Sequence, residues 1–243
     1  MPTFAVGEQV LVPAAKLADP DQAAYALISR LVLDRNERSV TVDDGAGGTV
    51  EIASRLVHKS SLGFLILRVG DLSTETTLLD PLAKSVLQFM RLLVPDEDLR
   101  VLELRTMAEL KAHWAANHAA TSHVLLIGHG SAAGLTFVDD GVVAASELVA
   151  ELEAAGPGTP VKSFISLACL TGRAGFGKPF SESSICRDFI GPFQSVHGAA
   201  ASGFVQSVLI EHLLDGVELG YAYDRLLRAC PGPVAFAGGA TAR

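Results

Sequence analysis

Two apolar stretches decide the fold: HVLLIGHG at residues 123–130 and VKSFISLAC at residues 161–169. Short, largely apolar runs of this length are typical of strands buried inside a parallel sheet. The segment between them is long enough for one right-handed crossover helix, so the two strands are predicted to be direct neighbours, about 4.8 Å apart. Because parallel strands end at the same edge of a sheet, His129 and Cys169 are predicted to lie side by side there.

The pattern around these strands predicts an α/β fold from about residue 62 onward. Apolar runs alternate with amphipathic helical segments, as in an open, mostly parallel sheet with helices on both faces. Asp80-Pro81 is interpreted as a helix start, with Asp80 accepting from free backbone amides. Thr106 and Glu109 have the spacing of a capping box for the next helix. The expected strands span residues 63–69, 100–104, 123–128, 161–168, 193–200 and 234–236.

The chain after Cys169 is expected to begin with a loop. Residues 173–183 are rich in glycine and serine, and a loop of this length could cover or uncover a site. A short helix that ends near Ile190 would bury Cys186. Two further helices are expected at 205–214 and 218–229.

Residues 1 to about 60 have a different pattern, in which valines and threonines alternate with polar residues in short runs. Such alternation predicts half-buried strands, and the glycine-rich stretch 44–48 is typical of a hairpin loop. The spacing is similar to that of small SH3-like or Tudor-like barrels. We therefore predict an SH3-like β domain at 1–60 and an α/β domain at 61–243. Strands of the small domain are expected at 7–12, 30–33, 39–43 and 49–52, with a helical turn at 24–29.

The composition limits the class of protein. The 243 residues are 49% hydrophobic, which is enough for one sizeable core and a small second domain. The formal net charge is −8 and no run of lysines or arginines could follow a phosphate backbone, so nucleic acid is not expected as a partner. Apolar runs such as 64–67 have the length of a strand rather than of a membrane span. Three cysteines, and a start without the features of a secretory signal, predict a cytoplasmic protein.

His129 and Cys169 form a candidate catalytic pair. A thiol is mostly protonated near pH 7, and an adjacent imidazole can take its proton and later deliver it to a leaving amine. Gly130 has no Cβ, so a substrate carbonyl could approach its backbone amide, and with the amide of Cys169 it could form an oxyanion hole. The sequence therefore predicts nucleophilic thiol chemistry at this edge of the sheet.

Three short motifs carry a family resemblance: IGHGS at 127–131, GLTF at 134–137 and LACLTG at 167–172. Together with the order of strands and helices over residues 62–238, they resemble the bacterial CHAT branch of the caspase-like peptidases, which are related to caspases and separase. The two motifs around His129 and Cys169 are the specific part of the resemblance.

The resemblance implies a caspase-like fold and the cleavage of a peptide bond after a selected P1 residue. Carried over to this sequence, Cys169 is the nucleophile, His129 is the general base and acid, and Gly130 is an oxyanion donor, without an obligatory third carboxylate. Leu167 departs from the pattern, because many relatives have a small polar residue there. If Leu167 faces the S1 pocket, specificity based on charge must come from elsewhere. Asp71 is a candidate P1-reading acid, and a helix cap or a turn explains it equally well.

The resemblance also implies a biological setting. A regulated protease of this kind would act on a protein or peptide substrate, and could activate a partner such as a pore-forming protein in bacterial defence or cell death. The module at 1–60 is a candidate binding site for a regulatory partner, a gate for the cleft or a stabilising element. No cofactor and no metal ion are expected.

Two other classes of function compete with the peptidase. One is a binding protein that keeps the peptidase fold as a catalytically silent interaction platform, with the small β module recruiting the partner. The other is a flavodoxin-like nucleotide binder, which would need a glycine-rich phosphate loop after the first strand; residues 71–74 offer none. A lone cysteine is usually a buried small hydrophobe, so coincidence is the competing explanation for Cys169.

The remaining reactive side chains have structural explanations. His197-Gly198 is interpreted as a strand segment near the cleft, and Ser131 lacks the Gly-x-Ser-x-Gly spacing of a hydrolase nucleophile. Residues 139–141 are interpreted as a turn. Cys186 and Cys230 are expected to be structural. Four further histidines lack the spacing of metal ligands: His113, His118, His123 and His212.

Overall fold

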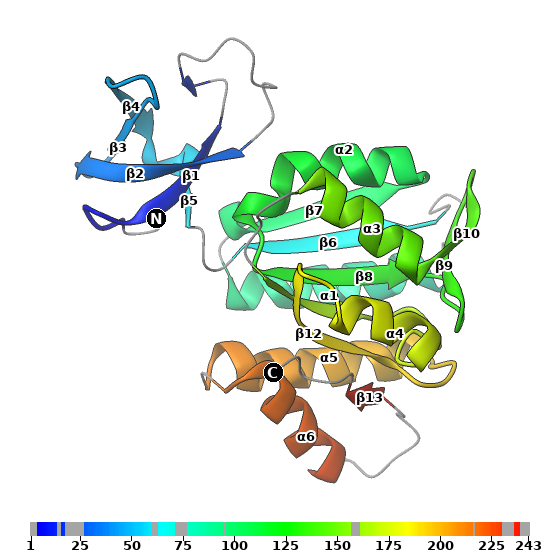
Figure 1. Ribbon diagram of the computed structural model, residues 1–243. Helices are drawn as coiled ribbons and strands as arrows, with labels where there is room; N and C mark the ends of the chain where they lie inside the picture. The colour runs from blue at the N-terminus through cyan, green and yellow to red at the C-terminus, as the bar shows by residue number, and fades with distance from the viewer. Residues whose placement is uncertain are drawn as a thin grey trace.

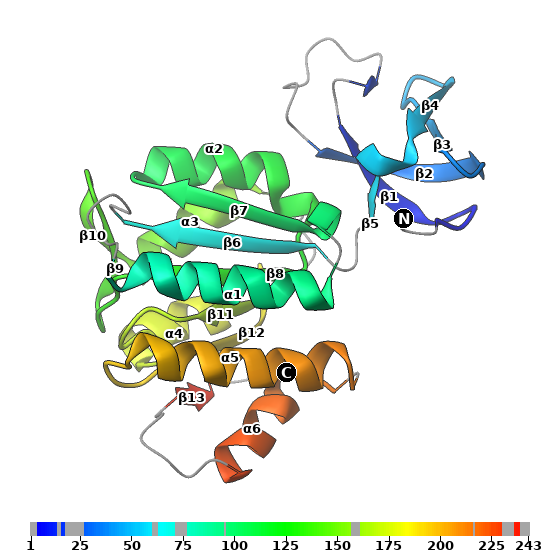
Figure 2. The same ribbon diagram turned by 180° about the vertical axis from the view of Figure 1, so that it is seen from behind.

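The computed structural model describes residues 4–13, 16–17, 27–59, 63–70, 77–94, 96–156, 161–215, 217–229 and 236–238. Within these ranges the chain forms a small antiparallel sheet, a larger and mostly parallel sheet, and a two-stranded hairpin. Figures 1 and 2 show the small antiparallel sheet and the large parallel sheet as separate bodies. The small sheet lies beyond the amino ends of the parallel strands.

The large sheet has the strand order β13-β12-β11-β8-β6-β7. The strands from β12 to β7 pair in parallel, and β13 is an antiparallel edge strand. This confirms the predicted α/β class and the predicted pairing of the two stretches that flank the candidate site. The strands are β6 (Phe64–Val69), β7 (Leu99–Leu104), β8 (His123–Gly128), β11 (Lys162–Ser166), β12 (Cys186–Pro192) and β13 (Phe236–Gly238).

Helices cover both faces of this sheet because its strands are apolar on both sides. In β6, Phe64 and Ile66 pack toward one layer of helices, and Leu65 and Leu67 pack toward the other. The first layer contains α1 (Leu79–Leu93), α5 (Gly198–Leu213) and α6 (Leu219–Ala229), and the second contains α2 (Met107–Asn117), α3 (Ala145–Ala155) and α4 (Ala174–Ser181).

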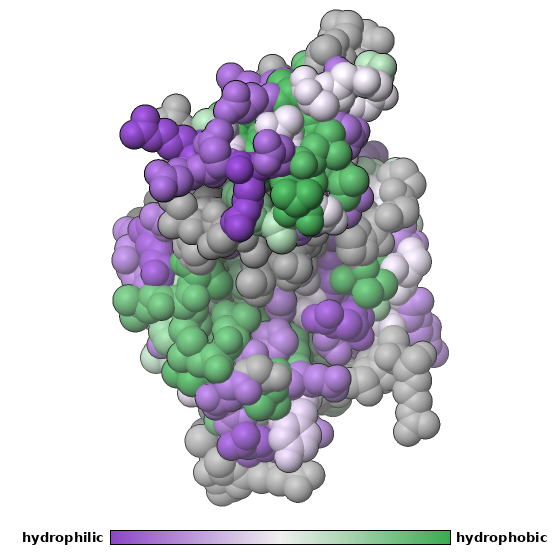
Figure 3. All heavy atoms as spheres, turned by 90° about the vertical axis from the view of Figure 1, so that its left-hand side faces the viewer, coloured by the Kyte–Doolittle hydropathy of each residue, from purple (hydrophilic) through white to green (hydrophobic). Residues whose placement is uncertain are grey.

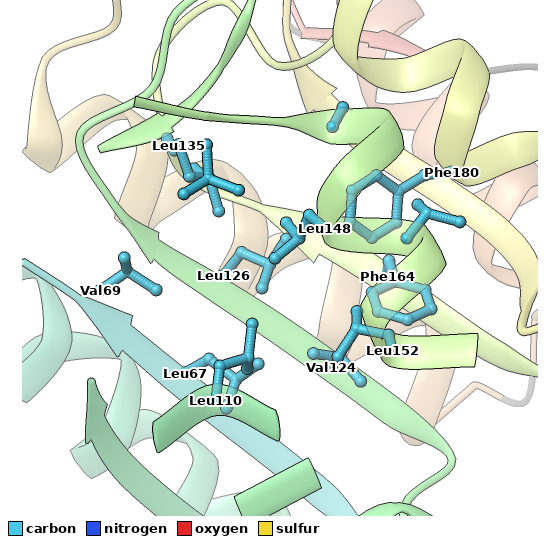
Figure 4. Close-up of a cluster of buried hydrophobic side chains, with 14 of the residues drawn as sticks. Leu67, Val69, Leu110, Val124, Leu126, Leu135, Leu148, Leu152, Phe164 and Phe180 are labelled. Carbon is cyan, nitrogen blue, oxygen red and sulfur yellow. The ribbon is translucent and has the colours of Figure 1, made fainter. Parts of the chain in front are cut away.

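The core under the second layer is shown in Figure 4. Leu126 and Phe164 rise from the neighbouring strands β8 and β11, and they belong to one buried cluster with Leu110 of α2, Leu148 of α3 and Phe180 of α4. Burying side chains of this size contributes about 1.5–3 kcal/mol each. This packing fixes β8 and β11 as the rigid centre from which the candidate site extends.

Several local signals in the sequence have the predicted structure. The capping box is present: the Glu109 amide donates to Thr106 Oγ1 at 3.1 Å, and the Thr106 amide donates to Glu109 Oε2 at 3.2 Å. The predicted turn at 139–141 is observed at residues 138–140, between β9 (Gly134–Phe137) and β10, which begins at Gly141 (Gly141–Ala144). Asp140 in that turn accepts a hydrogen bond at its Oδ2 from the amide of Met107, the first residue of α2, at 2.6 Å.

The predicted role of Asp80 as a helix cap is wrong. Helix α1 begins at Leu79, Leu78 occupies the cap position, and no side chain caps the helix. Asp80 instead pairs with Lys84 one turn later, at 2.7 Å, and with Arg68 of β6, at 3.1 Å. These two cations hold the pKa of the Asp80 carboxyl below its usual value, with the Lys84 contact as the larger cause.

Three predictions for the chain after Cys169 are also wrong. Residues 174–181 form helix α4 rather than a loop, because Phe176 and Phe180, one turn apart, are both fully buried and stack at 5.2 Å. The segment up to Ile190 is strand β12 rather than a helix. The expected strand at 193–200 is a connection followed by the start of α5. The phenylalanines of α4 and β12 pack against residues that are distant in the sequence, so their structure could not be predicted from the local pattern.

The small sheet has the order β4-β3-β2-β1-β5 and its own buried core of mostly valine side chains. At the predicted hairpin loop, the amides of Ala46 and Gly48 both donate to Asp44 Oδ1 at 2.8 Å. The expected helical turn is wrong for residues 27–29, which lie in β2; residues 24–26 lie outside the described ranges. The strands are β1 (Gln9–Pro13), β2 (Leu27–Arg35), β3 (Ser39–Asp43), β4 (Thr49–Ala53) and β5 (His58–Lys59).

Figure 3 shows the face at the amino ends of the parallel strands, where apolar side chains gather below the small sheet. Leu92 near the end of α1 and Leu214 just after α5 are among the exposed apolar residues of the chain. Within the ranges that the structure describes, no helix combines the length and the apolar character needed to cross a membrane.

Candidate active site

The parallel pairing of β8 with β11 brings the segments of His129 and Cys169 to the same end of the sheet. Leu126 pairs with Ser166, and His129 and Cys169 each follow three positions after these last paired residues. The Leu167 amide donates to the Leu126 carbonyl at 2.8 Å, which continues the ladder beyond the last paired position. Both residues therefore follow adjacent strands at the carboxyl edge of the sheet.

Gly130 lies directly against the backbone of Cys169. A Cβ at position 130 would be 2.6 Å from the Cys169 carbonyl oxygen and 2.9 Å from Ala168 Cβ. Both distances are shorter than van der Waals contact, so a side chain at position 130 would push the two backbone segments apart. The glycine that follows His129 thus allows the imidazole-bearing and thiol-bearing segments to approach closely.

The backbone amides of Gly130 and Cys169 have no hydrogen-bond acceptor among the residues that the structure describes. The amides that follow them do have one: Ser131 donates to the Gly134 carbonyl at 2.9 Å, and Leu170 to the Gln194 carbonyl at 3.3 Å. Backbone amides that keep their hydrogen-bonding capacity next to a nucleophile are what an oxyanion hole requires.

The β9–β10 hairpin holds the backbone at His129. The Thr136 amide donates to the His129 carbonyl at 2.9 Å. Ser131 tightens the turn that follows, because its hydroxyl oxygen accepts from the amides of Ala133 and Gly134 at 3.2 Å. His129 is an exposed residue. Ser131 is a turn residue, in keeping with its rejection as a nucleophile.

Cys169 is half-buried and is followed by a strained residue. Leu170 has φ +66°, and it is the one non-glycine residue with positive φ in the described chain. A left-handed conformation costs roughly 1–2 kcal/mol for a residue with a Cβ. Such strain persists only where the surroundings enforce it, and it concentrates at functional sites.

The other sequence-predicted site residues do not join this pair in the described structure. Asp71 lies outside the described residues. Leu167 is 3% exposed and packs into the core beneath α1 and α5, so its side chain offers little surface to a substrate. His197 is not a strand residue as predicted: it is the N-cap of α5, and its Nδ1 accepts from the Ala199 amide at 3.2 Å.

The remaining two cysteines are placed differently. Cys186 is buried at the start of β12 rather than in a helix, and burial, with Asp188 nearby, raises the pKa of its thiol to about 12. Cys230 lies outside the described residues. The catalytic roles of His129, Cys169 and Gly130 stay predictions at this point.

Sequence reasoning missed the residues that support the nucleophile turn. Ser166 and Thr171 are both fully buried, and Thr171 Oγ1 lies 2.8 Å from Ser166 Oγ. Gly172 and Gly191 allow the turn to cross β12, because a Cβ on Gly172 would clash with the Gly191 carbonyl. The glycines at positions 172 and 191 are a signal in the sequence that two backbone segments approach each other closely here.

A second group of polar side chains, the amino-edge cluster, lies at the opposite edge of the sheet. It contains Lys162, His123 and His212, together with His118 and Thr121. Lys162 is fully buried, and its Nζ donates to the carbonyls of His118 at 2.7 Å and Thr121 at 2.9 Å. The Nε2 atoms of His123 and His212 are 2.8 Å apart.

The described part of the chain holds no group of three or more histidine, cysteine or acidic side chains placed to bind a metal ion. No known family model matches the chain, and no curated protein matches it either.

Proposed function

We propose that this chain is a cysteine endopeptidase that uses Cys169 as nucleophile and His129 as general base and acid. The observation that carries the proposal is the close approach of Gly130 to the Cys169 backbone, with His129 and Cys169 each three positions beyond the last paired residues of β8 and β11. The motifs that resemble CHAT-type peptidases support it, since they fall on these two strand ends. In this proposal the α/β domain has a caspase-like fold and the small sheet is an SH3-like module.

Each step of the proposed reaction uses a group at the carboxyl edge. His129 takes the proton of the Cys169 thiol, and the thiolate attacks the carbonyl carbon of the scissile peptide. The resulting oxyanion accepts hydrogen bonds from the amides of Gly130 and Cys169. His129 then donates its proton to the leaving amine, and water hydrolyses the thioester with the same histidine as base.

The substrate of the proposed enzyme is an extended segment of a protein.

The small sheet lies beyond the amino ends of the parallel strands, away from the proposed site (Figures 1 and 2). A module in this position is better placed to bind a regulatory partner than to cover the site. By analogy with the family, the activity would be that of a selective protease in a bacterial defence or cell-death pathway in the cytoplasm.

The test is a cleavage map. Proteome-derived peptides are incubated with wild-type protein, Cys169→Ala, His129→Ala and His113→Ala, and new termini are identified by mass spectrometry. His113 is an exposed histidine on α2, so His113→Ala is a matched control for His129→Ala. We expect the same new termini from wild type and His113→Ala, with a shared P1 residue, and none from the other two.

Two results would contradict the proposal. New termini that are identical for wild type and Cys169→Ala would show that Cys169 is not the nucleophile. Intact peptides in every sample would favour the catalytically silent interaction platform. Cleavage of unfolded proteins at every type of residue would argue against a selective, regulated protease.

A further inference from the structure

A buried hydroxyl group ties the nucleophile turn together from below. Thr171 Oγ1 lies 2.8 Å from two oxygen atoms, Ser166 Oγ and the Ala168 carbonyl oxygen. The Ala168 amide donates to the same Ser166 Oγ at 3.3 Å. Both hydroxyl side chains are fully buried. The last residue of β11 is therefore bonded to residues immediately before and shortly after Cys169, which closes the turn into a ring with Cys169 on it.

The methyl group of the same threonine faces the other half of the site. Thr171 Cγ2 is 3.0 Å from the position that a Cβ on residue 130 would take. Thr171 thus has a hydroxyl that holds the turn of Cys169 and a methyl that lies against the segment of His129. In the described structure, this one side chain touches both segments whose relative placement the proposed reaction requires.

Backbone contacts hold the turn from the side of β12. The Gly172 amide donates to the Pro192 carbonyl at 2.8 Å, and the Leu170 amide donates to the Gln194 carbonyl at 3.3 Å. A Cβ on Gly191 would be 2.8 Å from Thr171 Oγ1, so the threonine hydroxyl is packed against the strand. These restraints explain how Leu170 is kept at φ +66°.

We infer that Thr171 is a positioning residue that holds the Cys169 thiol against His129 and the Gly130 amide. This inference rests on the proposed function. The hydroxyl supplies the positioning, because it is the part that bonds to Ser166 and Ala168 on the turn. The methyl fills space below Gly130. A residue of the same shape without the hydroxyl should therefore keep the fold and lose the placement of the thiol.

Two variants separate the two parts of the side chain. Thr171→Val keeps the shape and removes the hydroxyl, and Thr171→Ser keeps the hydroxyl and removes the methyl. The first readout is the rate at which iodoacetamide alkylates Cys169 at pH 7, followed by mass spectrometry of the Cys169 peptide. The second is kcat and KM on a peptide from the cleavage map. The third is the free energy of unfolding in urea.

We expect Thr171→Val to lower kcat by about 10–100-fold, as small displacements of reacting groups do, with KM within about twofold of wild type. Its Cys169 alkylation rate should fall as well. Thr171→Ser should rescue both rates to within about threefold of wild type. If Thr171→Val fails to fold, Ser166→Ala removes the other oxygen of the ring and should show the same separation of kcat from KM.

Two outcomes are distinguishable. If Thr171→Val and Thr171→Ser lose activity equally and in proportion to their loss of stability, the threonine is only structural and the inference is overturned. The same holds if Cys169 alkylation depends on His129 but not on the Thr171 hydroxyl. If Cys169 alkylation in wild type is unaffected by His129→Ala, the proposed function itself fails.

Discussion

The two edges of the large sheet carry the same types of residue in opposite environments. At the carboxyl edge, His129 is exposed, Cys169 is half-buried, and the Gly130 and Cys169 amides lack a protein acceptor among the described residues. At the amino edge, Lys162 and His123 are buried and bonded to protein groups. At the carboxyl edge, two backbone amides have no acceptor among the described residues, whereas the polar side chains of the amino edge hold the fold.

Burial displaces the pKa values of groups at the amino edge. Burial lowers the pKa of His123 to about 3, with His212 and Arg187 as smaller causes. Burial also lowers the pKa of Lys162 to about 8. Displaced pKa values are often used to find active sites, but structural networks displace them too. Here His123 stacks on Phe64 at 4.4 Å and bonds to Ser122, which explains its burial without a substrate.

The largest loss of activity is expected from a substitution at the carboxyl edge. Gly130→Ala places a Cβ 2.6 Å from the Cys169 carbonyl and displaces the proposed oxyanion donor. We expect kcat to fall by about 100–1000-fold, the usual cost of losing one such donor. Gly203→Ala in α5 is the control, because a Cβ there meets nothing within 4 Å. Equal activity of the two variants in the peptide assay would contradict the proposed oxyanion hole.

The next effect concerns the amino edge and should be one of stability. Lys162→Met removes the donor to the His118 and Thr121 carbonyls, and buried acceptors left without a donor cost about 1–3 kcal/mol each. We expect a free energy of unfolding lower by about 3 kcal/mol in urea, with kcat within about twofold of wild type at a temperature where the variant is folded. A large fall in kcat without a loss of stability would show that the two edges are coupled.

The pair of histidines predicts how stability depends on pH. The pKa of His123 is lowered from 6.5 to about 3 in the folded state, so below pH 6.5 the unfolded chain takes up a proton that the folded chain does not. The stabilisation is therefore complete above pH 6.5 and declines as the pH falls toward 3. Between pH 7 and pH 5 we expect His123 to contribute about 2 kcal/mol to the loss of stability in urea unfolding, in addition to the contribution of His118, whose pKa burial lowers to about 4.

His123→Gln supplies the comparison for this pH dependence. Glutamine does not titrate, so the loss between pH 7 and pH 5 should shrink by most of that amount. If the free energy of unfolding of His123→Gln falls as steeply between pH 7 and pH 5 as that of wild type, other groups cause the pH dependence. Burial of His123 at the amino edge would then not explain it.

The smallest expected effect concerns the strain at Leu170. Glycine adopts φ +66° without the cost that a Cβ imposes, so Leu170→Gly should raise the free energy of unfolding by up to about 1 kcal/mol. The control is Leu92→Gly in α1, an exposed helical position where glycine should lower it by about 1 kcal/mol. If both variants are destabilised equally, the turn at Cys169 stores no strain.

The sequence predicted the centre of the fold well because its signals there are local. Apolar runs of strand length gave β6, β7, β8 and β11 to within two residues at each end, and the capping box at Thr106 gave the start of α2. Asp80 misled because an acidic residue before a proline resembles a cap, whereas its charge partners Arg68 and Lys84 are visible only in the structure.

The predictions failed where structure depends on contacts distant in sequence. The glycines and serines of 173–183 resemble a loop, and the structure shows that Phe176 and Phe180 of α4 pack into the core against the sheet. For the site, adjacency of His129 and Cys169 follows from strand order, so the sequence could predict it. The support from Ser166 and Thr171 depends on the shape of the turn and could not be predicted.

The activation of Cys169 by His129 can be tested without any knowledge of the substrate, by a site-resolved labelling rate. Iodoacetamide labelling of Cys169 at pH 7 is followed by mass spectrometry in wild type, His129→Ala and His113→Ala. We expect a rate at least about tenfold lower in His129→Ala and an unchanged rate in His113→Ala, because the thiolate is the reactive form. Equal rates in all three proteins would contradict it.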